Sequence, residues 1–298
     1  MHDVVIVGCG IAGMTSAIYL ARAGKKVLIL ERDTIGGQIA SSPLVENFPG
    51  YKSISGSELS NNIYEQVENL NIDVEIEDVL KIEKGDIKKV ITDDNTYECK
   101  SIILATGAKY RLLGLENEEN LIGNGLHFCV ACDGAFYKDK VVAVIGGGNS
   151  AIVNVNALSD ICRKVYVIQN LDDLTCELSL KRQLSNKDNV EVICSSVVTR
   201  LIGDEFLEGI VIKNTEEREI KLDGMFISIG LVPQSELASN FIDLDKYNYI
   251  LSDDCKTNVD GIFVAGDCRT KKYRQLTTAA NDGTISAMEA IRYLDTCK

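Results

Sequence analysis

The sequence predicts an α/β protein with two Rossmann-like, three-layer nucleotide-binding domains, the second inserted into the first. Three observations support this prediction. A strand, glycine turn, helix and strand follow one another at the N-terminus, and the same series recurs in the middle of the chain. The last segment, 234–298, contains a strand and a long helix that are expected to return to the first domain. With 298 residues, of which 45% are hydrophobic, the chain is long enough to build two cores.

The first series begins with the apolar strand DVVIV and continues through a G-x-G-x-x-G turn into a periodic helix and a second strand, KKVLILER. The turn glycines are Gly8, Gly10 and Gly13. In this context one glycine allows the tight turn, one leaves room for a pyrophosphate and one lets the helix pack closely. Unpaired N–H groups at the helix N-terminus face the diphosphate, and Glu31, at the end of the second strand, can accept from ribose hydroxyls.

The second series reads KVVAVIGGGNSA, then a helix from 152 to 161, then RKVYVI. Small residues at 146, 148 and 151 stand where the three glycines stand in the first turn. Gln169 lies 23 residues beyond Gly146, and Glu31 lies the same 23 residues beyond Gly8. A neutral amide is a weaker acceptor than a carboxylate. We therefore expect the second turn to fold like the first but to hold a ribose less well.

Two further segments place the domain boundaries. Residues 96–108 form a strand that ends in a Thr-Gly turn, which fits a return under the first nucleotide. Residues 261–268 form another strand, stopped by Gly-Asp ahead of a long amphipathic helix. We therefore expect one domain at 1–112 and 234–298 and a second at 113–233, with hinges near 112–114 and 232–233.

Charge and composition exclude several classes of protein. The formal net charge is −13 and no strongly basic run is present, so nucleic-acid binding is not expected. Every apolar run is too short to cross a bilayer, and the N-terminus lacks the basic region and cleavage site of a signal peptide. We expect a soluble, cytoplasmic protein. In that compartment ten cysteines do not indicate a disulfide framework, and only Cys129 and Cys132 form a close pair.

The segment HFCVACDGAFYKDK carries the sharpest chemical signal. Cys129 and Cys132, three residues apart at a helix start, can form a small-loop disulfide, and the helix end and its neighbours lower the pKa of such thiols. Asp133 could move the proton that the dithiol and disulfide forms exchange. A zinc site is less favoured, since it needs four ligands and the chain has no second paired motif and only two histidines, one of them His127. A protease-type Cys–His pair is less favoured still, because it would leave two nucleotide folds without a purpose.

Several ordered motifs together resemble one family. They are, in chain order, GGQI (36–39), VENFPG (45–50), ATGA (105–108), CVACDG (129–134) ahead of the second glycine turn, AGD (265–267) and YRQ (273–275). They extend over almost the whole chain and make it similar to the low-molecular-weight thioredoxin reductases. The resemblance implies FAD as cofactor, thioredoxin as substrate, a homodimer, and domains that rotate so that the dithiol alternates between flavin and thioredoxin. It also implies that 1–112 with 234–298 binds FAD and that 113–233 is an NAD(P)H-type domain carrying the redox cysteines.

The resemblance also implies residue roles, with no metal among them. Cys132 matches the cysteine that meets the flavin ring, Cys129 the one that attacks the disulfide of thioredoxin, and Asp133 the acid–base residue. The positions that match FAD contacts around the diphosphate, the ribose and the flavin are Gly8, Gly10, Gly13, Glu31, Gly37, Gln38, Asn47, Thr106, Gly107, Asp267 and Gln275.

One segment departs from the family. NADPH-dependent members carry a His-Arg-Arg segment and a further Arg after the strand that matches VYVI, and these cations hold the 2′-phosphate. In this chain the positions that match those cations are Gln169, Asn170, Leu171 and Thr175. Two acids, Asp172 and Asp173, lie between the third and the fourth of them. This substitution pattern disfavours NADPH. It disfavours NADH less, because NADH has no 2′-phosphate, although NADH usually wants an acid at the position of Gln169.

The sequence therefore looks most like the ferredoxin-dependent flavin thioredoxin reductases, which use no pyridine nucleotide. Ferredoxin would deliver electrons one at a time to FAD, and the pair would pass to the Cys129–Cys132 disulfide and on to thioredoxin. Ferredoxins are usually acidic, as is this chain, so docking needs a local basic patch, for which the candidates are Lys109, Arg111, Lys271, Lys272 and Arg274. The alternatives are an NADH- or NADPH-dependent thioredoxin reductase and a flavin redox sensor without turnover.

Overall fold

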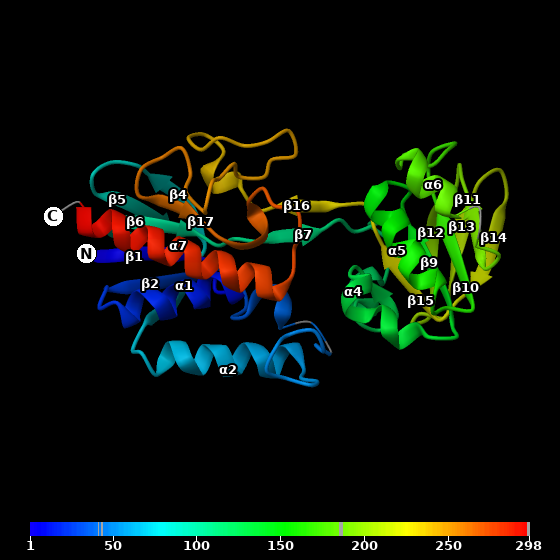
Figure 1. Ribbon diagram of the computed structural model, residues 1–298, viewed down its shortest axis with the longest axis horizontal. Coiled ribbons are helices and arrows are strands. Elements are labelled where there is room, and N and C mark those ends of the chain that lie inside the picture. The colour runs from blue at the N-terminus through cyan, green and yellow to red at the C-terminus, as the bar shows by residue number, and fades with distance from the viewer. Residues whose placement is uncertain (41, 43, 185–186, 297–298) are drawn as a thin grey trace. The chain divides into compact units, whose positions relative to one another are not determined.

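The computed structural model describes residues 1–40, 42, 44–184 and 187–296 and divides into two compact units (Figure 1). One unit combines Met1–Lys109 with Val232–Lys298, and the other is Tyr110–Leu231. The second unit is thus inserted between two segments of the first. The sequence expectation placed the same two changes at 112–113 and 233–234.

Within the described part of the chain, a seven-stranded sheet forms the centre of the first unit. Its parallel strands are β1 (His2–Val7), β2 (Val27–Glu31), β3 (Asp73–Ile76), β6 (Thr96–Leu104) and β17 (Ile262–Val264). The antiparallel strands β4 (Val79–Glu83) and β5 (Lys88–Thr92) extend it, giving the order β3-β2-β1-β6-β5-β4 with β17 on β6. β1 and β2 are apolar and buried along most of their length, as in strands covered on both faces.

The α-helices of this unit are α1 (Ile11–Arg22), α2 (Gly56–Glu68) and α7 (Leu276–Thr296). α1 and α7 pack closely because small residues face each other. A Cβ on Gly283 would lie 2.4 Å from the carbonyl oxygen of Ala12, and the hydroxyls of Ser16 and Ser286 are 3.1 Å apart. One-turn helices lie in the loops: η1 (Gly37–Ile39), η3 (Glu236–Ala238) and η4 (Gly266–Cys268).

The inserted unit is built on a parallel sheet in the order β11-β10-β9-β15-β8. Its strands are β8 (Leu126–His127), β9 (Val141–Ile145), β10 (Lys164–Ile168), β11 (Val190–Ile193) and β15 (Gly224–Ile227). A second, antiparallel sheet contains β12 (Val197–Ile202), β13 (Gly209–Lys213) and β14 (Glu217–Lys221). The helical segments are α3 (Glu118–Leu121), α4 (Val130–Asp133), η2 (Gly134–Tyr137), α5 (Asn149–Ser159) and α6 (Leu178–Leu184). Among the described residues, none of the helices combines the length and the apolarity needed to cross a membrane.

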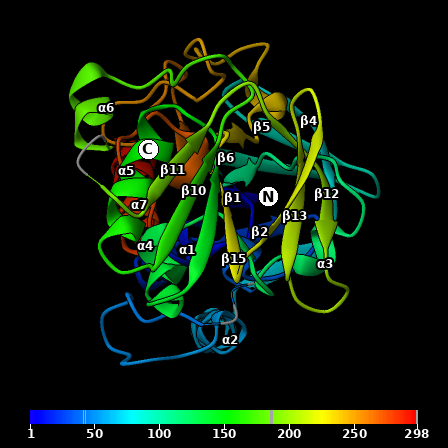
Figure 2. The same ribbon diagram turned by 90° about the vertical axis from the view of Figure 1, so that its right-hand side faces the viewer.

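The parallel sheet of the inserted unit has a core on each face. Alternate residues of β9 divide between the two cores: Val142 and Val144 pack toward α5, whereas Ala143 and Ile145 pack toward the antiparallel sheet. The result is three layers, with α5 on one face and β12–β14 on the other (Figure 2). The predicted α/β class with two Rossmann-like domains is confirmed.

The two connections between the units pair with each other as strands β7 (Ala108–Tyr110) and β16 (Leu231–Pro233), as Figure 1 shows. Hydrogen bonds flank this short ladder at both ends. The N–H of Gln234 donates to the carbonyl of Gly107 at 3.0 Å, and the N–H of Arg111 donates to that of Gly230 at 3.1 Å. The two places where the chain changes unit are therefore joined to each other.

Candidate redox and dinucleotide sites

The first glycine turn lies between β1 and α1 and leaves space for a phosphate group. A Cβ on Gly8 would lie 2.4 Å from the carbonyl oxygen of Ala105, and one on Gly13 would lie 1.9 Å from that of Gly8, so packing requires glycine at both positions. A Cβ on Gly10 would meet only the carbonyl oxygen of Gly36, at 3.9 Å. α1 begins directly after Gly10, which has no side chain to cap it, so the first N–H groups can serve an anion. The turn therefore fits a dinucleotide diphosphate.

Glu31 lies at the carboxyl end of β2, beside this turn. Its carboxylate accepts hydrogen bonds from the N–H groups of Cys9, at 2.7 Å, and Asp33, at 3.0 Å. These contacts hold the side chain against the turn, and a carboxylate has further lone pairs for other donors. The group is half-buried and suits the ribose hydroxyls of a dinucleotide whose diphosphate occupies the turn.

Gly37 and Gln38 lie in η1, which is attached to the same turn. A bridge between Gly10 and Gly36 holds the start of this segment, and the N–H of Gly36 donates to the carbonyl of Cys9 at 2.9 Å. The amide of Gln38 donates to the carbonyl of Ala108 at the beginning of β7. The structure therefore brings these two sequence-predicted positions to the glycine turn and to the connection that leaves the unit.

Asn47, Thr106, Gly107 and Gln275 also lie in the first unit. The amide of Asn47 donates to the side chain of Gln275 over 3.4 Å, although the two are far apart in the chain. Thr106 follows β6 and donates through its hydroxyl to the carbonyl of Gln234. Gly107 has a φ of 69°, and a Cβ there would have no atom within 4 Å. The loop after β6 thus has open space beside a backbone that favours glycine.

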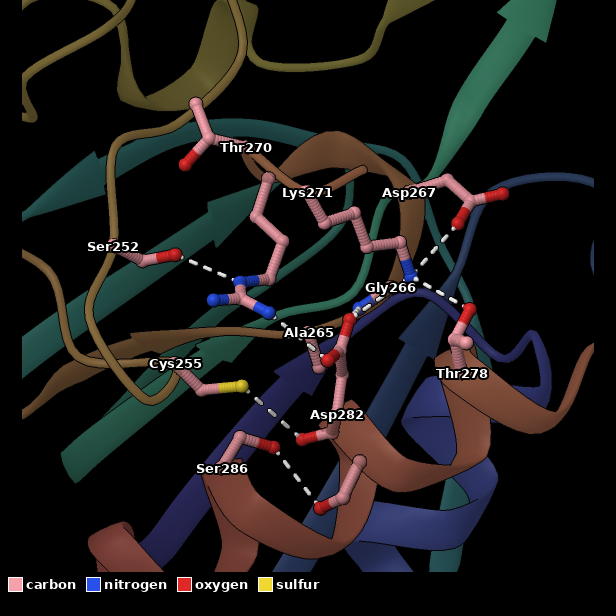
Figure 3. Close-up of polar contacts among 12 residues, drawn as sticks. Ser252, Cys255, Ala265, Gly266, Asp267, Thr270, Lys271, Thr278, Asp282 and Ser286 are labelled. Atoms are coloured by element: carbon pink, nitrogen blue, oxygen red, sulfur yellow. Dashed lines mark hydrogen bonds and ion pairs between the residues drawn. The ribbon is translucent and has the colours of Figure 1, made fainter. Parts of the chain in front are cut away.

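Asp267, in η4 after β17, belongs to a buried ion network (Figure 3). Lys271 Nζ lies 3.0 Å from Asp267 Oδ1 and 3.0 Å from Asp282 Oδ2, and Arg269 Nη1 lies 3.0 Å from Asp282 Oδ1. Asp282 is only 3% exposed, and the N–H of Gly266 donates to it as well. Two cations and an N–H compensate the buried carboxylate. In Figure 3 the second oxygen of Asp267 is turned away from Lys271, where it can accept from a cofactor hydroxyl.

This network corrects the predicted basic patch. The side chain of Lys271 is 9% exposed and paired with two carboxylates, so it cannot serve as a surface cation. Arg274 donates to the backbone carbonyls of Asp267, Arg269 and Lys271, and its guanidinium lies 4.1 Å from the centre of the Tyr249 ring. The exposed cations that remain from the prediction are Lys109, Arg111 and Lys272.

Cys129 and Cys132 form a disulfide at the start of α4. The N–H groups of Cys132 and Asp133 both donate to the carbonyl of Cys129, at 3.1 and 2.9 Å, which closes the turn. α4 (Val130–Asp133) continues directly into η2 (Gly134–Tyr137), so the disulfide lies at the start of a short helical segment. Because the two sulfurs are bonded to each other, the segment has the arrangement of a redox disulfide and not that of a zinc site.

Asp133 is buried beside His127 and Tyr137. His127 Nδ1 lies 3.3 Å from Asp133 Oδ2, and His127 Nε2 lies 2.7 Å from the hydroxyl of Tyr137. The three residues come from β8, α4 and η2 and are 6% to 8% exposed. Burial, then the negative charges of Asp133 and Asp223, raise the pKa of Tyr137 to about 12. The Asp133 carboxyl is therefore largely shielded from water, and His127 lies within ion-pair distance of it.

The second glycine turn is covered by its own chain. Gln169 is 4% exposed, and a Cβ on Gly147 would lie 2.7 Å from both Cδ and Nε2 of its amide. The same Cβ would lie 3.0 Å from Leu174, a buried residue of the following loop. The N–H of Thr175 donates to the carbonyl of Gly147 at 2.9 Å. The loop after β10 is thus folded onto the turn.

Two acids of this loop already have partners. Asp173 forms an ion pair with Lys181 of α6 and accepts from the N–H of Leu174 at 2.8 Å. Asn149, the first residue of α5, accepts from the N–H of Glu177 at 2.8 Å and donates to its carboxylate at 3.2 Å. Residues 169–177 contain no Lys or Arg. A phosphate here would find no cation in the loop, and the ammonium of Lys181 is already paired with Asp173.

Sequence reasoning missed three of these residues. His127 entered only as a possible zinc ligand and Tyr137 not at all, although both lie in the quoted HFCVACDGAFY segment. Asp282 was also missed. Its signal is an acid inside a helix otherwise lined by small residues, TTAANDGTISA, since such an acid is buried only when cations compensate it.

Comparison with known proteins gives matches over nearly the whole chain. The family model described as pyridine nucleotide-disulphide oxidoreductase matches residues 2–283. A Clostridium pasteurianum protein described as a 34.2 kDa protein in rubredoxin operon is 39% identical over 298 residues, which are 98% of this chain and 97% of that one. The thioredoxin reductase of Listeria monocytogenes is 36% identical over 304 residues, covering 100% of this chain and 95% of its own. The crystal structure of thioredoxin reductase from Streptococcus pyogenes matches with a TM-score of 0.94 at 38% identity, over 99% of both chains.

Proposed function

Because the chain belongs to the thioredoxin reductases of the pyridine nucleotide-disulphide oxidoreductase family, we propose that it reduces thioredoxin with electrons from reduced ferredoxin rather than from NADPH or NADH. As a member of this family it is a flavoenzyme, with FAD as cofactor and a redox-active Cys129–Cys132 disulfide. FAD supplies the chemistry that side chains lack, because it takes up electrons singly or in pairs and passes a pair to a disulfide.

The first unit supplies the residues that would hold FAD. The Gly8–Gly10–Gly13 turn has room for the diphosphate, and Glu31 lies at the ribose position. We assign the flavin side to the remaining positions that match the family, namely Gly37, Gln38, Asn47, Thr106, Gly107, Asp267 and Gln275. The open space beside Gly10 and Gly107 and the outward oxygen of Asp267 support this assignment.

The inserted unit supplies the disulfide and its proton chemistry. We propose that Cys132 accepts electrons from the flavin side, that Cys129 attacks the disulfide of thioredoxin, and that Asp133 transfers the protons that the two exchanges require. The position of Asp133 supports its role, since its buried carboxyl lies in the same helical turn as Cys132.

The observation that carries the choice of donor is the position of Gln169 over Gly147. An NADPH site needs cations for the 2′-phosphate, and an NADH site needs an acid for the ribose. This unit has a buried amide at that position, and the nearby cation Lys181 is paired with Asp173. A nicotinamide nucleotide would therefore gain neither contact, whereas a protein donor does not need this turn.

The direction of electron flow is favourable. Plant-type ferredoxins have potentials of about −400 mV and thioredoxin of about −270 mV. For a pair of electrons this difference corresponds to about 6 kcal/mol. Two ferredoxins would therefore drive the reduction of one thioredoxin without help from a nucleotide.

Docking an acidic ferredoxin on a chain of net charge −13 requires local cations. Lys271 is paired with two carboxylates, and Arg274 donates to backbone carbonyls of the first unit. We therefore propose the exposed cations Lys109 and Lys272 of the same unit as the docking cations. We also propose a homodimer, which sedimentation of the purified protein would test.

An anaerobic titration tests the proposal. The oxidised yellow protein is mixed in turn with NADPH, NADH and reduced ferredoxin while the flavin absorbance is followed. We expect ferredoxin to bleach the flavin and thioredoxin to restore its colour. Rapid bleaching by either nucleotide at micromolar concentration would overturn the choice of donor. Reduced rubredoxin belongs in the same series, because one relative is described as part of a rubredoxin operon.

Two serine variants test the roles proposed for the two redox cysteines. In Cys132→Ser the flavin should still be bleached by ferredoxin, but no electrons should reach thioredoxin. Cys129→Ser should likewise lose thioredoxin reduction. Undiminished thioredoxin reduction by Cys132→Ser would refute its role. Bleaching by ferredoxin in the unmodified protein without any reduction of thioredoxin would instead favour a flavin redox sensor.

A second candidate is an NADH-dependent thioredoxin reductase. The preserved geometry of the second turn favours it: Gly146 has a φ of 121°, and α5 begins after Gly148 without a side-chain cap. The same geometry is expected if the turn binds a diphosphate and if the domain keeps the turn only because it needs it to fold. The NADH arm of the titration decides between the two, and Gln169→Glu should increase any NADH bleaching, because it restores the charged acceptor.

A further inference from the structure

The protons of the disulfide exchange must pass through a buried region, where Asp133 is the proposed proton carrier. Water has little access to this carboxyl, since Asp133 is 8% exposed. A carboxyl that repeatedly gains and loses a proton in such a place needs a neighbour that stabilises its ionised form. His127 is the neighbour within ion-pair distance, with Nδ1 3.3 Å from Asp133 Oδ2.

The ring of His127 is held from two further sides. Its Nε2 lies 2.7 Å from the hydroxyl of Tyr137, and its plane lies over Phe226, with ring centres 5.4 Å apart and planes inclined by 29°. Tyr137 in turn lies edge-on to both His127 and Phe226. An imidazole held in this way cannot turn away from Asp133 without breaking the Tyr137 hydrogen bond and the stacking.

The same contacts allow a ring proton of His127 to face Asp133. The high pKa of Tyr137, about 12, keeps its hydroxyl protonated at neutral pH, so this hydroxyl is able to donate a hydrogen bond to Nε2 of His127. In that arrangement the ring proton of His127 lies on Nδ1, the atom that faces Asp133. The other charged groups around this cluster act on Tyr137: Asp223 is a second negative charge near its hydroxyl, and Lys140 lies over its ring at 5.2 Å.

We propose that His127 is a positioning residue for the redox disulfide: its Nδ1–H, oriented by Tyr137, holds and stabilises the Asp133 carboxylate between proton transfers. The inference rests on the proposed role of the Cys129–Cys132 pair in reducing a disulfide. It adds to that role a second residue pair, which acts on the proton carrier and does not touch the substrate.

The Cys129 thiolate attacks one sulfur of the thioredoxin disulfide, which forms a mixed disulfide and releases a thiolate on thioredoxin. That thiolate takes the proton of the Asp133 carboxyl, and His127 Nδ1–H donates to the resulting carboxylate. Cys132 then gives its proton to Asp133 while its sulfur attacks Cys129. The enzyme disulfide forms again, and the second thioredoxin thiolate leaves and is protonated by water. The enzyme dithiol loses two electrons, and thioredoxin gains them.

Removing the donor should make the Asp133 carboxylate less stable, so that the carboxyl gives up its proton less readily. The test uses protein reduced with dithionite, so it does not depend on ferredoxin or a nucleotide. Two pH profiles are measured, the rate of single-turnover thioredoxin reduction and the rate of Cys129 alkylation by iodoacetamide. In His127→Phe, which keeps an aromatic ring over Phe226, we expect the profile of thioredoxin reduction to move to higher pH by about one unit. The alkylation profile should move to lower pH, because a carboxyl that stays neutral no longer opposes ionisation of the thiol in the same turn. Thioredoxin reduction at neutral pH should fall about tenfold.

Conservative variants separate positioning from packing. The amide nitrogen of Asn in His127→Asn can take the place of Nδ1, so this variant should keep the original profiles. In His127→Gln the amide nitrogen reaches the place of Nε2 instead, so this variant should shift the pH profiles. His2→Phe, at the other histidine of the chain, serves as the control in the first unit. Thermal unfolding and flavin content confirm that each variant is folded.

Unchanged profiles in both His127→Phe and His127→Gln would overturn the proposal and leave His127 a packing residue. If His127→Phe does not fold, the comparison of His127→Asn with His127→Gln decides by the same criterion. The alkylation profile involves neither thioredoxin nor a donor. A failure of the proposed function would therefore appear in the turnover assays of unmodified protein and would leave the alkylation result interpretable.

Discussion

The carboxylate of Glu31 accepts a hydrogen bond from the backbone N–H of Cys9 at 2.7 Å. Gln169 stands at the equivalent place in the inserted unit, and its amide lies against Gly147, the counterpart of Cys9. The two nucleotide folds thus share one geometry and differ in charge at the position proposed to face a ribose. A dinucleotide needs both the glycine turn and the acid, so the first unit is the one expected to hold a dinucleotide tightly.

The Glu31→Gln variant should bind FAD about tenfold more weakly, because a hydrogen bond to a charged group contributes about 1.5 kcal/mol. Flavin fluorescence during titration of the apoprotein with FAD measures the dissociation constant. Gln169→Glu makes the opposite exchange in the other unit and should leave FAD affinity unchanged. Equal FAD affinity of Glu31→Gln and the unmodified protein would remove Glu31 from the cofactor site.

Cys9 should make stability depend on pH in the alkaline range. Burial, then the nearby Glu31 carboxylate, raise the pKa of this thiol from 9.0 to about 12. The folded state therefore keeps the proton that the unfolded chain loses above pH 9. The stabilisation is complete below pH 9 and is lost progressively as pH rises toward 12. Between pH 9 and pH 10.5 this thiol should lower the free energy of unfolding by about 2 kcal/mol.

Urea unfolding of the unmodified protein and Cys9→Ala at pH 7, 9 and 10.5 checks this dependence. Both proteins lose stability through their other groups, so the difference between them is the quantity to follow. At pH 7 that difference reports packing alone. It should shift in favour of Cys9→Ala as pH rises, and a constant difference would show that the thiol titrates alike in both states.

Glu118 should stabilise the start of the inserted unit. Its side chain is buried, and its carboxylate accepts from three successive N–H groups, those of Leu113, Gly114 and Leu115, at 2.7, 2.7 and 3.1 Å. Gln in its place would turn an NH₂ group toward one of these donors. We expect Glu118→Gln to lower the free energy of unfolding by about 2 kcal/mol.

Calorimetry of the two proteins measures this effect as a lower melting temperature. Glu119→Gln removes the same charge from the exposed neighbour and is the matched control. Equal melting temperatures for the Glu118 and Glu119 variants would mean that the three N–H groups find other acceptors.

Much of the fold and part of the site could be predicted because their signals are local. A glycine turn between an apolar strand and a periodic helix is recognisable from neighbouring residues alone, and it occurs twice with the same spacing. Cys129 and Cys132 are neighbours whatever the rest of the chain does, so their pairing was readable as well. The positions proposed to face a dinucleotide rest on the same local patterns and stay predictions.

Contacts between separate segments could not be predicted in this way. Gln169 and Gly147 meet only when β10 lies beside β9, and the sequence could not say whether this turn is open or covered. Tyr137 reaches His127 only because η2 and β8 fold together. Pairing of this kind also determines which charges are buried. A lysine in a polar segment is indistinguishable in sequence from an exposed one until its acid partners are located.

Lys271 and Lys272 are adjacent in the sequence and should behave oppositely when each is replaced by Met. Lys271 is buried between Asp267 and Asp282, and removing one partner of a buried ion network leaves unpaired charge, with a loss of about 3 kcal/mol. We expect Lys271→Met to melt at a temperature roughly 6–12 °C lower and to lose FAD more readily, since Asp267 loses its cation. Lys272 is exposed, so Lys272→Met should keep its stability and its FAD while reduction by ferredoxin slows and depends less on salt. Calorimetry, flavin release and stopped-flow reduction at two salt concentrations measure the three effects. A stable Lys271→Met with slow ferredoxin reduction would return Lys271 to the docking surface and contradict the buried network as its role.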